Sequence, residues 1–427
     1  MVCVRKPVLT SVAILAFAAL AGPALAQQGL DEPFQKPFKE SLAGKTVAYV
    51  PVAMNFDLTD EQRMLQSAAK DMLAARLNSD KIRALAESGD ALDETLWSEI
   101  VGLGWPGLIV SEAHGGQGLG MVELVVLMEQ VGYALLPGPL LSNMLAANAL
   151  EQAGTDSLKQ RYLAPLAEGG KRGTLAIWDA GGGTTPDQIT LEAQRSNGGY
   201  TLSGEKLFVF DADRADFLIV AATDGQRFVV DRGATGLTVT PTPAMDATRK
   251  QYSVRLEGVE VGADAEFTAD TDTFQAIWAR AITMLAAESV GIAQRAMEMA
   301  VEYAKERKQF DRPIGAYQAV SHKCAQMLLE TEGARSAAFY AAWTADNEPG
   351  DAPLAAAMAK AYASDAGCDV TGAALQVHGG IGFTWEHDLH LWLKRARTNA
   401  ALLGDSRYQR EIVAGLTLDR ALAPAGV

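Results

Sequence analysis

The sequence predicts an α+β fold in which a small β-barrel or sandwich lies between two helical regions. Three observations lead to this prediction. Apolar residues recur at helical spacing after Thr59, the period shortens to that of strands from about Gly173, and helical spacing returns beyond Thr271. A change in hydrophobic period marks a change in secondary structure. We therefore expect an N-terminal helical domain at 54–171, a middle β-domain at 172–269 and a C-terminal helical bundle at 270–427.

The N-terminal helical region begins at a capping signal. Thr59 precedes Gln62 by three residues, the spacing at which the two side chains satisfy each other's backbone amides. A glycine-rich connection, Leu103–Gly120, follows two predicted helices. No strand precedes it and its spacing is not that of a phosphate loop, so we interpret it as a tight turn between packed helices.

The middle region consists of short runs rich in β-branched and aromatic residues, separated by Gly, Asp and Asn turns. The predicted strands are Tyr200–Phe210, Phe217–Ala222, Arg227–Asp231 and Tyr252–Leu256. Helical spacing then returns. The predicted helices are Trp278–Lys305, Tyr317–Asp346, Leu354–Gln376, His390–Leu403 and Arg407–Leu416.

Composition excludes several classes of protein. The 427 residues are 48% hydrophobic and 21% charged, as in a globular enzyme of two or three domains. A net charge of -15 argues against nucleic acid as a partner, because binding it requires a concentrated basic face. The three cysteines form neither a metal motif nor a disulfide framework. His387 and His390 are three residues apart, but no further ligands accompany them, and we expect no metal site.

Two segments of the C-terminal half suit a dinucleotide's phosphates. Arg307 ends the long predicted helix, and a guanidinium can bind a pyrophosphate through two hydrogen bonds. In the second segment, Gln376–Phe383, glycines let the backbone amides approach an anion without a Cβ in the way. Each signal alone has a structural alternative: a solvated arginine at a charged helix end, and a helix C-cap.

In this order, Tyr303–Phe310 and Gln376–Phe383 resemble the flavin-binding signature of the acyl-CoA dehydrogenase family. The resemblance runs from Met54 to the C-terminus. It implies an acyl-CoA substrate, electron-transfer flavoprotein as electron acceptor, and a homo- or hetero-oligomer, either dimer or tetramer. It also implies that FAD is bound commonly across a subunit interface, with Phe208 stacking on the flavin ring. The FAD-binding residues carried over from the family are Arg307, Phe310, Gln376, Gly379, Gly380 and Gly382.

The sequence departs from the family pattern around the flavin. The glycine that usually follows Phe310 is Asp311, which lacks glycine's backbone freedom and adds a negative charge near a phosphate. The segments matching the flavin-edge hydroxyl donors, Ile177–Gly183 and Phe208–Phe210, have largely lost those hydroxyls.

The largest departure concerns the catalytic base. The family's glutamate is matched by Leu403, which cannot accept a proton. Asp405 and Glu288 are the remaining candidates, although Asp405 could instead cap the next helix and Glu288 could be a buried structural residue. We therefore expect one of two kinds of protein. The first is a dehydrogenase that needs a partner subunit, as in family members that act as unlike pairs on steroid-derived or bulky CoA thioesters. The second is a catalytically silent structural subunit.

Residues 1–53 form a leader outside this resemblance. Arg5 and Lys6 precede an apolar run, and Ala24–Ala26 gives a small-x-small site, the pattern of a secretory signal peptide. The following stretch, Phe34–Met54, resembles the mature start of a periplasmic sugar-binding protein. A mis-called start codon or a fusion at Met54 would leave a cytoplasmic enzyme, and this is the interpretation we adopt. Export to the periplasm is the alternative.

Overall fold

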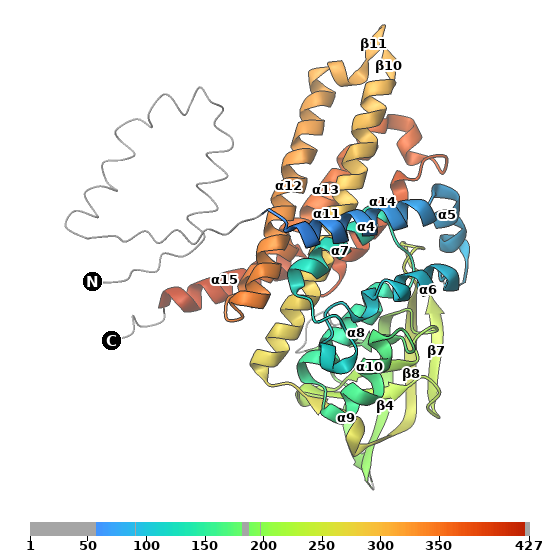
Figure 1. Cartoon of the computed structure of the whole chain (residues 1–427), viewed down its shortest axis with the longest axis vertical. Coiled ribbons are helices and arrows are strands. Elements are labelled where there is room, and N and C mark those ends of the chain that lie inside the picture. The colour runs from blue at the N-terminus through green and yellow to red at the C-terminus, as the bar shows by residue number, and fades with distance from the viewer. Residues whose placement is uncertain (1–56, 90, 182–187, 197, 423–427) are drawn as a thin grey trace, which may run out of the picture. The chain divides into compact units, whose positions relative to one another are not determined.

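A computed structural model describes residues 57–89, 91–181, 188–196 and 198–422. The leader, and with it both interpretations of its role, lies outside these residues. The chain from Leu58 onward forms one compact unit. Within it, a helical region, two sheets and a helical bundle follow one another along the chain (Figure 1), so the predicted α+β fold is confirmed.

The N-terminal region consists of α4 (Asp60–Arg76), α5 (Ser79–Glu87), α6 (Glu94–Gly102), α7 (Met121–Ala134), α8 (Leu140–Ala153), α9 (Asp156–Leu158) and α10 (Ala164–Ala167). The predicted capping box is confirmed at the start of α4. The Gln62 amide donates to Thr59 Oγ1 at 3.2 Å, and the Thr59 amide donates to Gln62 Oε1 at 3.0 Å. Both free backbone donors are thereby satisfied.

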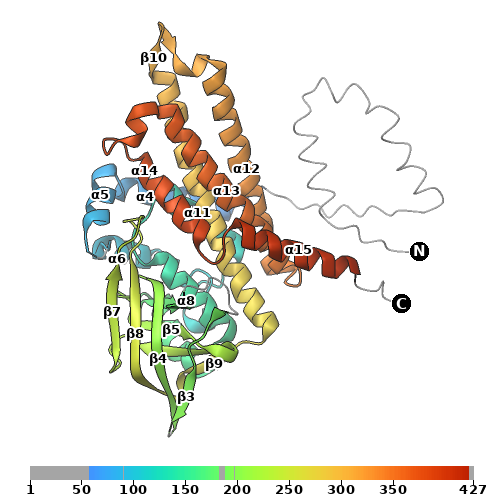
Figure 2. The ribbon, with the colours of Figure 1, turned by 180° about the vertical axis from the view of Figure 1, so that it is seen from behind.

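The middle region contains two sheets. The first has the order β1 (Gly173–Ala176), β5 (Phe217–Ala221), β6 (Gln226–Asp231), β9 (Glu266–Thr268). The second has the order β2 (Trp178–Asp179), β4 (Gly199–Phe210), β8 (Gln251–Gly262), β7 (Leu237–Thr242), with β3 (Ala193–Ser196) beside β4. Figure 2 shows the second sheet from its outer side.

Strand β5 is buried on both faces, which explains its uninterrupted apolar sequence. Leu218 and Val220 pack between the two sheets, in a core that includes Val254 of β8. Phe217 and Ile219 point the other way, into a core formed with α8 and α10. Because successive strand residues face opposite sides, one strand joins the helical region to the sheets.

The C-terminal bundle consists of α11 (Thr271–Glu306), α12 (Gln318–Asn347), α13 (Ala352–His378), α14 (Leu389–Ala401) and α15 (Ser406–Leu422). Helix α11 packs against α7, α8, α12, α13 and α14, and runs from the sheets to the hairpin of β10 (Lys308–Gln309) and β11 (Arg312–Pro313) (Figure 1). Its length and hydropathy would allow a membrane span, but 83% of its most apolar stretch is buried in the protein, as in the core helix of a soluble bundle.

Two glycines allow α7 and α11 to cross at close range. A Cβ at Gly132 of α7 would lie 2.0 Å from the Glu288 carbonyl oxygen of α11. A Cβ at Gly291 of α11 would lie 1.8 Å from the Glu129 carbonyl oxygen of α7. Any larger residue at either position would therefore push the two helices apart.

Candidate active site and flavin-binding elements

An apolar cavity lies where α8, the sheets, α11 and the α14–α15 turn meet. It encloses about 30 Å³, roughly the volume of one water molecule. Among the described residues that line it, the polar side-chain atoms belong to Ser142, Thr174 and Trp178, and none is a carboxylate. The lining residues are Leu141, Ser142, Leu145, Thr174, Leu175, Ile177, Trp178, Leu207, Phe208, Phe210, Leu285, Leu402 and Leu403.

Leu403 stands at the cavity in a constrained turn. Helix α14 ends at Ala401, two residues before the predicted end, and Leu403 adopts a left-handed conformation with φ +53°. Gly404 follows with φ +88°, and a Cβ there would lie 2.2 Å from the Tyr408 ring. Gln409 Nε2 donates to the Leu403 carbonyl oxygen at 2.8 Å. The turn therefore holds the Leu403 side chain at a fixed place in the cavity wall.

Asp405 is exposed and lies outside the cavity lining. Its Oδ1 accepts a hydrogen bond from the Tyr408 amide at 2.9 Å, and its carbonyl oxygen accepts one from the Gln409 amide at 3.0 Å. These are the contacts of an N-cap residue at the start of α15. The geometry thus favours the capping role over the role of catalytic base.

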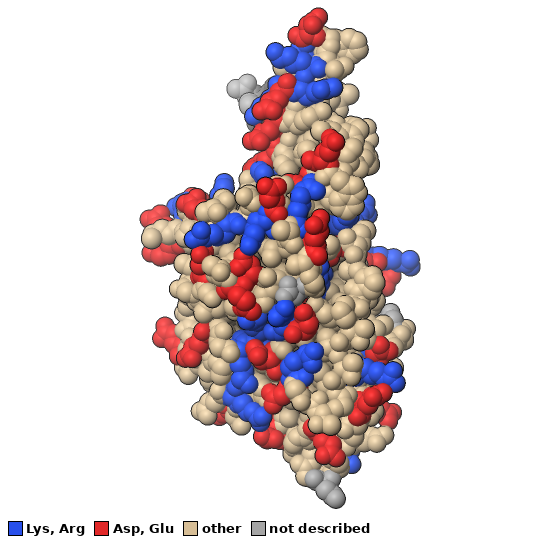
Figure 3. All heavy atoms as spheres, turned by 90° about the vertical axis from the view of Figure 1, so that its right-hand side faces the viewer, with Lys and Arg blue, Asp and Glu red and all other residues tan. Residues whose placement is uncertain are grey.

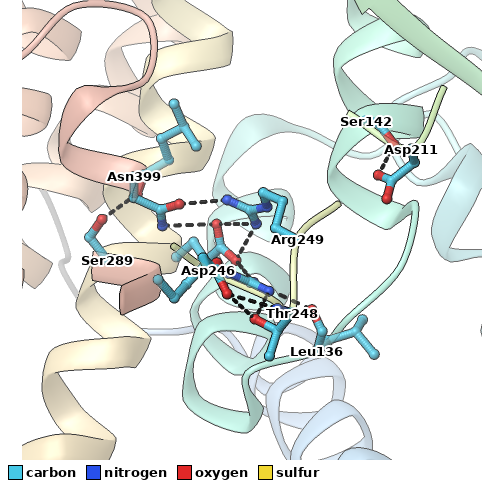
Figure 4. A network of polar contacts seen from close by, with 11 residues as sticks. Leu136, Ser142, Asp211, Asp246, Thr248, Arg249, Ser289 and Asn399 are labelled. Atoms are coloured by element: carbon cyan, nitrogen blue, oxygen red, sulfur yellow. Dashed lines mark hydrogen bonds and ion pairs between the residues drawn. The ribbon is translucent and has the colours of Figure 1, made fainter. Parts of the chain in front are cut away.

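Glu288 is fully buried in a cluster of ion pairs and does not line the cavity. Both of its oxygens accept hydrogen bonds from Arg249 Nη2, at 2.6 and 2.8 Å. Arg395 Nη1 donates to Oε1 at 2.8 Å, and Asn399 Nδ2 donates to Oε2 at 2.9 Å (Figure 4). Burial alone would raise the pKa of Glu288, but the two guanidinium groups lower it to about 2. An ionised carboxylate that accepts four hydrogen bonds from three side chains is a structural partner, and the geometry does not favour it as a base.

The cluster joins three parts of the fold. Arg395 also donates to Asp246 and, at 2.6 Å, to Thr248 Oγ1 (Figure 4). Asp246 and Arg249 lie in the connection between β7 and β8, Glu288 lies on α11, and Arg395 lies on α14. Two arginines face two carboxylates, so the charges balance inside the protein. Reading the sequence missed all of these residues except Glu288, although Arg395 at a buried position of α14 was a detectable signal.

One further carboxyl group lies near the cavity. Ser142, which lines it, donates to Asp211 Oδ2 at 2.7 Å. Burial raises the pKa of Asp211 to about 6, although the hydrogen bond from Ser142 opposes this shift. Asp211 does not itself line the cavity, and no sequence pattern singles it out.

The two predicted phosphate-binding segments lie side by side at one end of the bundle. The Tyr303 ring, one turn before Arg307, stacks on the His378 ring, which immediately precedes Gly379, with ring centroids 4.6 Å apart. Arg307 caps α11 and is exposed. No ion pair engages Arg307 in the described part of the chain, so its guanidinium is available to an anion.

The glycine turn leaves its backbone open. Gly379 has φ +63°, and neither Gly379 nor Gly380 has an atom within 4 Å of where a Cβ would stand. The Gln376 side chain, one turn earlier, is exposed. Gly382 is buried, and a Cβ there would come within 3.0 Å of the Leu375 carbonyl oxygen. An anion can therefore approach the turn directly.

Two aromatic residues flank these elements. Phe310, at the tip of the β10–β11 hairpin, is 89% exposed, and both it and Asp311 have left-handed backbones, with φ +52° and +64°. Phe208 lies at an irregularity of β4 with φ +56° and is 43% exposed beside the cavity. A ring exposed at a strained position is available to stack on a flat ligand.

In Ile177–Gly183, the segment that matches the flavin-edge donors, the Asp179 side chain is held by contacts within the sheet region. Asp179 Oδ2 accepts a hydrogen bond from the Leu191 amide at 3.2 Å, and Oδ1 pairs with the buried Lys206 at 2.6 Å. Residues 182–187 lie outside the described residues. Within the described chain, no three His, Cys, Asp or Glu side chains are grouped to hold a metal ion.

The geometry fits FAD at its phosphate end, because an exposed arginine stands beside an unobstructed glycine turn. Phe208 and the apolar cavity, which suit a flavin ring, lie about 30 Å away along α11, so they suit the ring of a different FAD from the one at Arg307. A helical, sheet and helical fold with these features is that of a flavoprotein oxidoreductase.

Comparisons with known proteins agree. The family models for the N-terminal and C-terminal domains of acyl-CoA dehydrogenases match residues 59–170 and 278–416. The chain is 32% identical over 354 residues to the acyl-CoA dehydrogenase IpdE2 of Mycolicibacterium smegmatis, covering 82% of this chain and 97% of that protein. The chain belongs to the acyl-CoA dehydrogenase family.

Solved structures agree with this assignment. The Tcur3481-Tcur3483 steroid ACAD G363A variant superposes with a TM-score of 0.78 at 30% identity, covering 85% of this chain and 99% of that one. The ChsE4-ChsE5 complex from Mycobacterium tuberculosis gives 0.79 at 28% identity, covering 87% and 100%. The predicted family, enzyme class and FAD cofactor are thus confirmed. The roles of the individual site residues remain predictions.

Proposed function

We propose that this chain dehydrogenates the α and β carbons of a CoA thioester, together with a partner subunit that supplies the catalytic base. FAD, when bound, accepts the hydride. The single observation that carries the proposal is that Leu403 occupies the cavity wall and that no carboxylate of the described residues lines the cavity. Removing an α-proton requires an acceptor, and the described lining offers none.

The proposed FAD site uses the elements at the end of the bundle. Arg307 would contact the diphosphate through its guanidinium, and the backbone amides of the Gly379–Gly382 turn would contact it from the other side. Gln376 and Phe310 would contact the adenine half of the same FAD. Phe208 lies beside Leu285, about 30 Å along α11 from Arg307, so it would stack on the ring of another FAD, one shared with a partner subunit. The support is the adjacency created by the Tyr303–His378 stack, together with the exposure of Arg307.

An apolar acyl group suits the cavity. Its volume of about 30 Å³ admits only a small group, so a ring-bearing acyl chain requires lining side chains such as Leu285 and Leu402 to move. A steroid-derived or otherwise bulky CoA thioester is the substrate class we propose. The support is that a structural neighbour is described as a steroid ACAD.

The proposed partner would cover the apolar surface around the phosphate elements. Phe310, Phe383 and Trp385 are 89%, 71% and 71% exposed there, more apolar surface than scattered single residues explain. On the face in Figure 3, charged groups of both signs are interspersed, with broad uncharged areas in the upper part. The complex formed by ChsE4 and ChsE5 supports an unlike pair. We propose electron-transfer flavoprotein as the electron acceptor, and therefore a cytoplasmic enzyme.

Flavin bleaching tests this proposal. The purified protein is scanned for a flavin spectrum and then mixed with a panel of acyl-CoAs, with and without the product of a neighbouring related gene. Bleaching only with the partner supports a shared site. Strong bleaching by the lone protein, abolished by Asp405→Asn, would contradict the proposal and reveal a displaced base. No bleaching in either case, with FAD bound, favours the alternative of a catalytically silent subunit.

A further inference from the structure

Lys360, on α13, is a fully buried lysine whose nitrogen contacts no carboxylate in the described chain. It is 1% exposed, and its Nζ donates to neutral oxygens only. These are Ser364 Oγ at 3.0 Å and the carbonyl oxygens of Asn399, Ala400 and Gly404 at 2.9, 3.3 and 3.3 Å. A buried ammonium is costly unless its donors are used, so this arrangement requires an explanation.

The carbonyl acceptors belong to one short segment. Asn399 and Ala400 are in the last turn of α14, where carbonyl groups have no partner within the helix, and Gly404 lies in the turn before α15. A cation at this place also faces the negative end of the helix dipole. Lys360 therefore acts as a C-cap supplied by another helix, and it links the end of α14 to the turn beyond it.

The linked segment is the one that carries Leu402 and Leu403 into the cavity wall. Leu403 is left-handed, a conformation that costs a non-glycine residue energy and persists only when its surroundings hold it. We propose that Lys360 is the positioning residue of this cavity: its ammonium group fixes the turn and so decides where the side chain at position 403 stands. This inference deepens the proposed function, because that position is where the family's base stands.

The charge of Lys360 depends on pH close to neutrality. Burial lowers the pKa of Lys360 to about 8, opposed by the carboxylates of Asp405 and Asp365 and by Cys368. Asp405 is in the turn itself, and the other two are on the same helix as Lys360. Lys360 is therefore charged at neutral pH and loses its proton between about pH 7 and pH 9. The neutral amine still offers two donors and no longer carries the cost of burying a charge. Because an exposed lysine keeps its ordinary pKa of 10.5, opening the turn takes up a proton and becomes harder as pH rises through about 8.

Hydrogen exchange measured by mass spectrometry on the full chain tests the inference without requiring any substrate. The peptide covering residues 402–409 is compared with a reference peptide from α7, in wild type, Lys360→Met and the matched control Lys159→Met. We expect Lys360→Met to lower protection of the turn about tenfold, as for loss of a charge-assisted hydrogen bond, and the control to leave it unchanged.

The pH arm separates positioning from general stability. After correction for intrinsic exchange, wild-type protection of the turn should rise between pH 7 and pH 9, while α7 stays constant and Lys360→Met shows no step. An unchanged wild-type turn over this range would overturn the inference, and so would a step that persists in Lys360→Met. Comparing protection of the wild-type turn at pH 7 and pH 9 tests the inference even if the variant does not fold. Failure of acyl-CoA to bleach the flavin would count against the proposed function and leave this result intact.

Discussion

Replacing Glu288 by glutamine should destabilise the protein strongly at neutral pH. The variant keeps the shape of the side chain but leaves Arg249 and Arg395 facing only Asp246. The folded-state pKa of about 2 lies some 2.5 units below the ordinary 4.5. At about 1.36 kcal/mol per unit, this corresponds to about 3 kcal/mol of stability from the ionised carboxylate. That size agrees with the cost of breaking a buried ion pair, about 3–5 kcal/mol.

The stability that Glu288 contributes should fall as the pH is lowered. Because the folded-state pKa of Glu288 is depressed, its contribution is fully present above pH 4.5 and is lost as pH falls toward 2. Urea unfolding free energies of wild type and Glu288→Gln should therefore differ by about 3 kcal/mol at pH 7 and by clearly less at pH 3. Glu302→Gln, at an exposed position of the same helix, is the control and should differ little from wild type at either pH. A difference below about 1 kcal/mol at pH 7, or one that does not shrink on acidification, would refute the assigned role.

Four further variants test the site. Arg307→Ala should weaken FAD binding by about 1.5–3 kcal/mol through loss of a charge-assisted contact; unchanged flavin retention on gel filtration, with exposed Arg255→Ala as control, would contradict the phosphate assignment. Asp311→Gly removes a negative charge and suits φ +64°, so FAD should titrate with higher affinity, and equal or lower affinity would remove Asp311 from the site. Leu403→Glu restores a proton acceptor at the cavity and should let the lone protein bleach with acyl-CoA, whereas Leu403→Gln should not. Asp211→Asn should raise the free energy of unfolding at pH 7. The folded-state pKa of about 6 exceeds the ordinary 3.8, so the stability that the protonated carboxyl contributes is present below pH 3.8 and is lost as pH rises through 6. A gain in stability that does not vanish in acid would be inconsistent with this account.

Sequence patterns correctly predicted the structural features that depend on neighbouring residues, such as helix caps and buried strands. The capping box at Thr59, the period of α4 and the apolar run of β5 follow from caps and burial within a few residues, and the structure contains them. The end of α14 was predicted two residues late because Leu402 and Leu403 continue the apolar period, while Gly404 and the distant Lys360 hold the turn after Ala401.

The site depended on contacts that no local pattern records. The sequence placed Glu288 in mid-helix but could not show that Arg249, 39 residues earlier, and Arg395, 107 residues later, would pair with it. It identified Arg307 and Gly379 only through a family signature, whereas the Tyr303–His378 stack that brings them together spans two helices. The cavity lined by Leu403 likewise forms from five segments of the chain, and none of them alone predicts it.

Because α7 and α11 cross closely, a substitution at Gly132 of α7 would change the position of Glu288 on α11. Its carbonyl oxygen lies against Gly132 while its side chain lies among the arginines, so backbone and carboxylate are constrained from opposite sides. A methyl group added at Gly132 would press on the Glu288 backbone as it pushed the two helices apart, and so would strain the four hydrogen bonds that the carboxylate accepts. The spacing between two helix backbones thus sets the electrostatics at the junction of the sheets and the bundle.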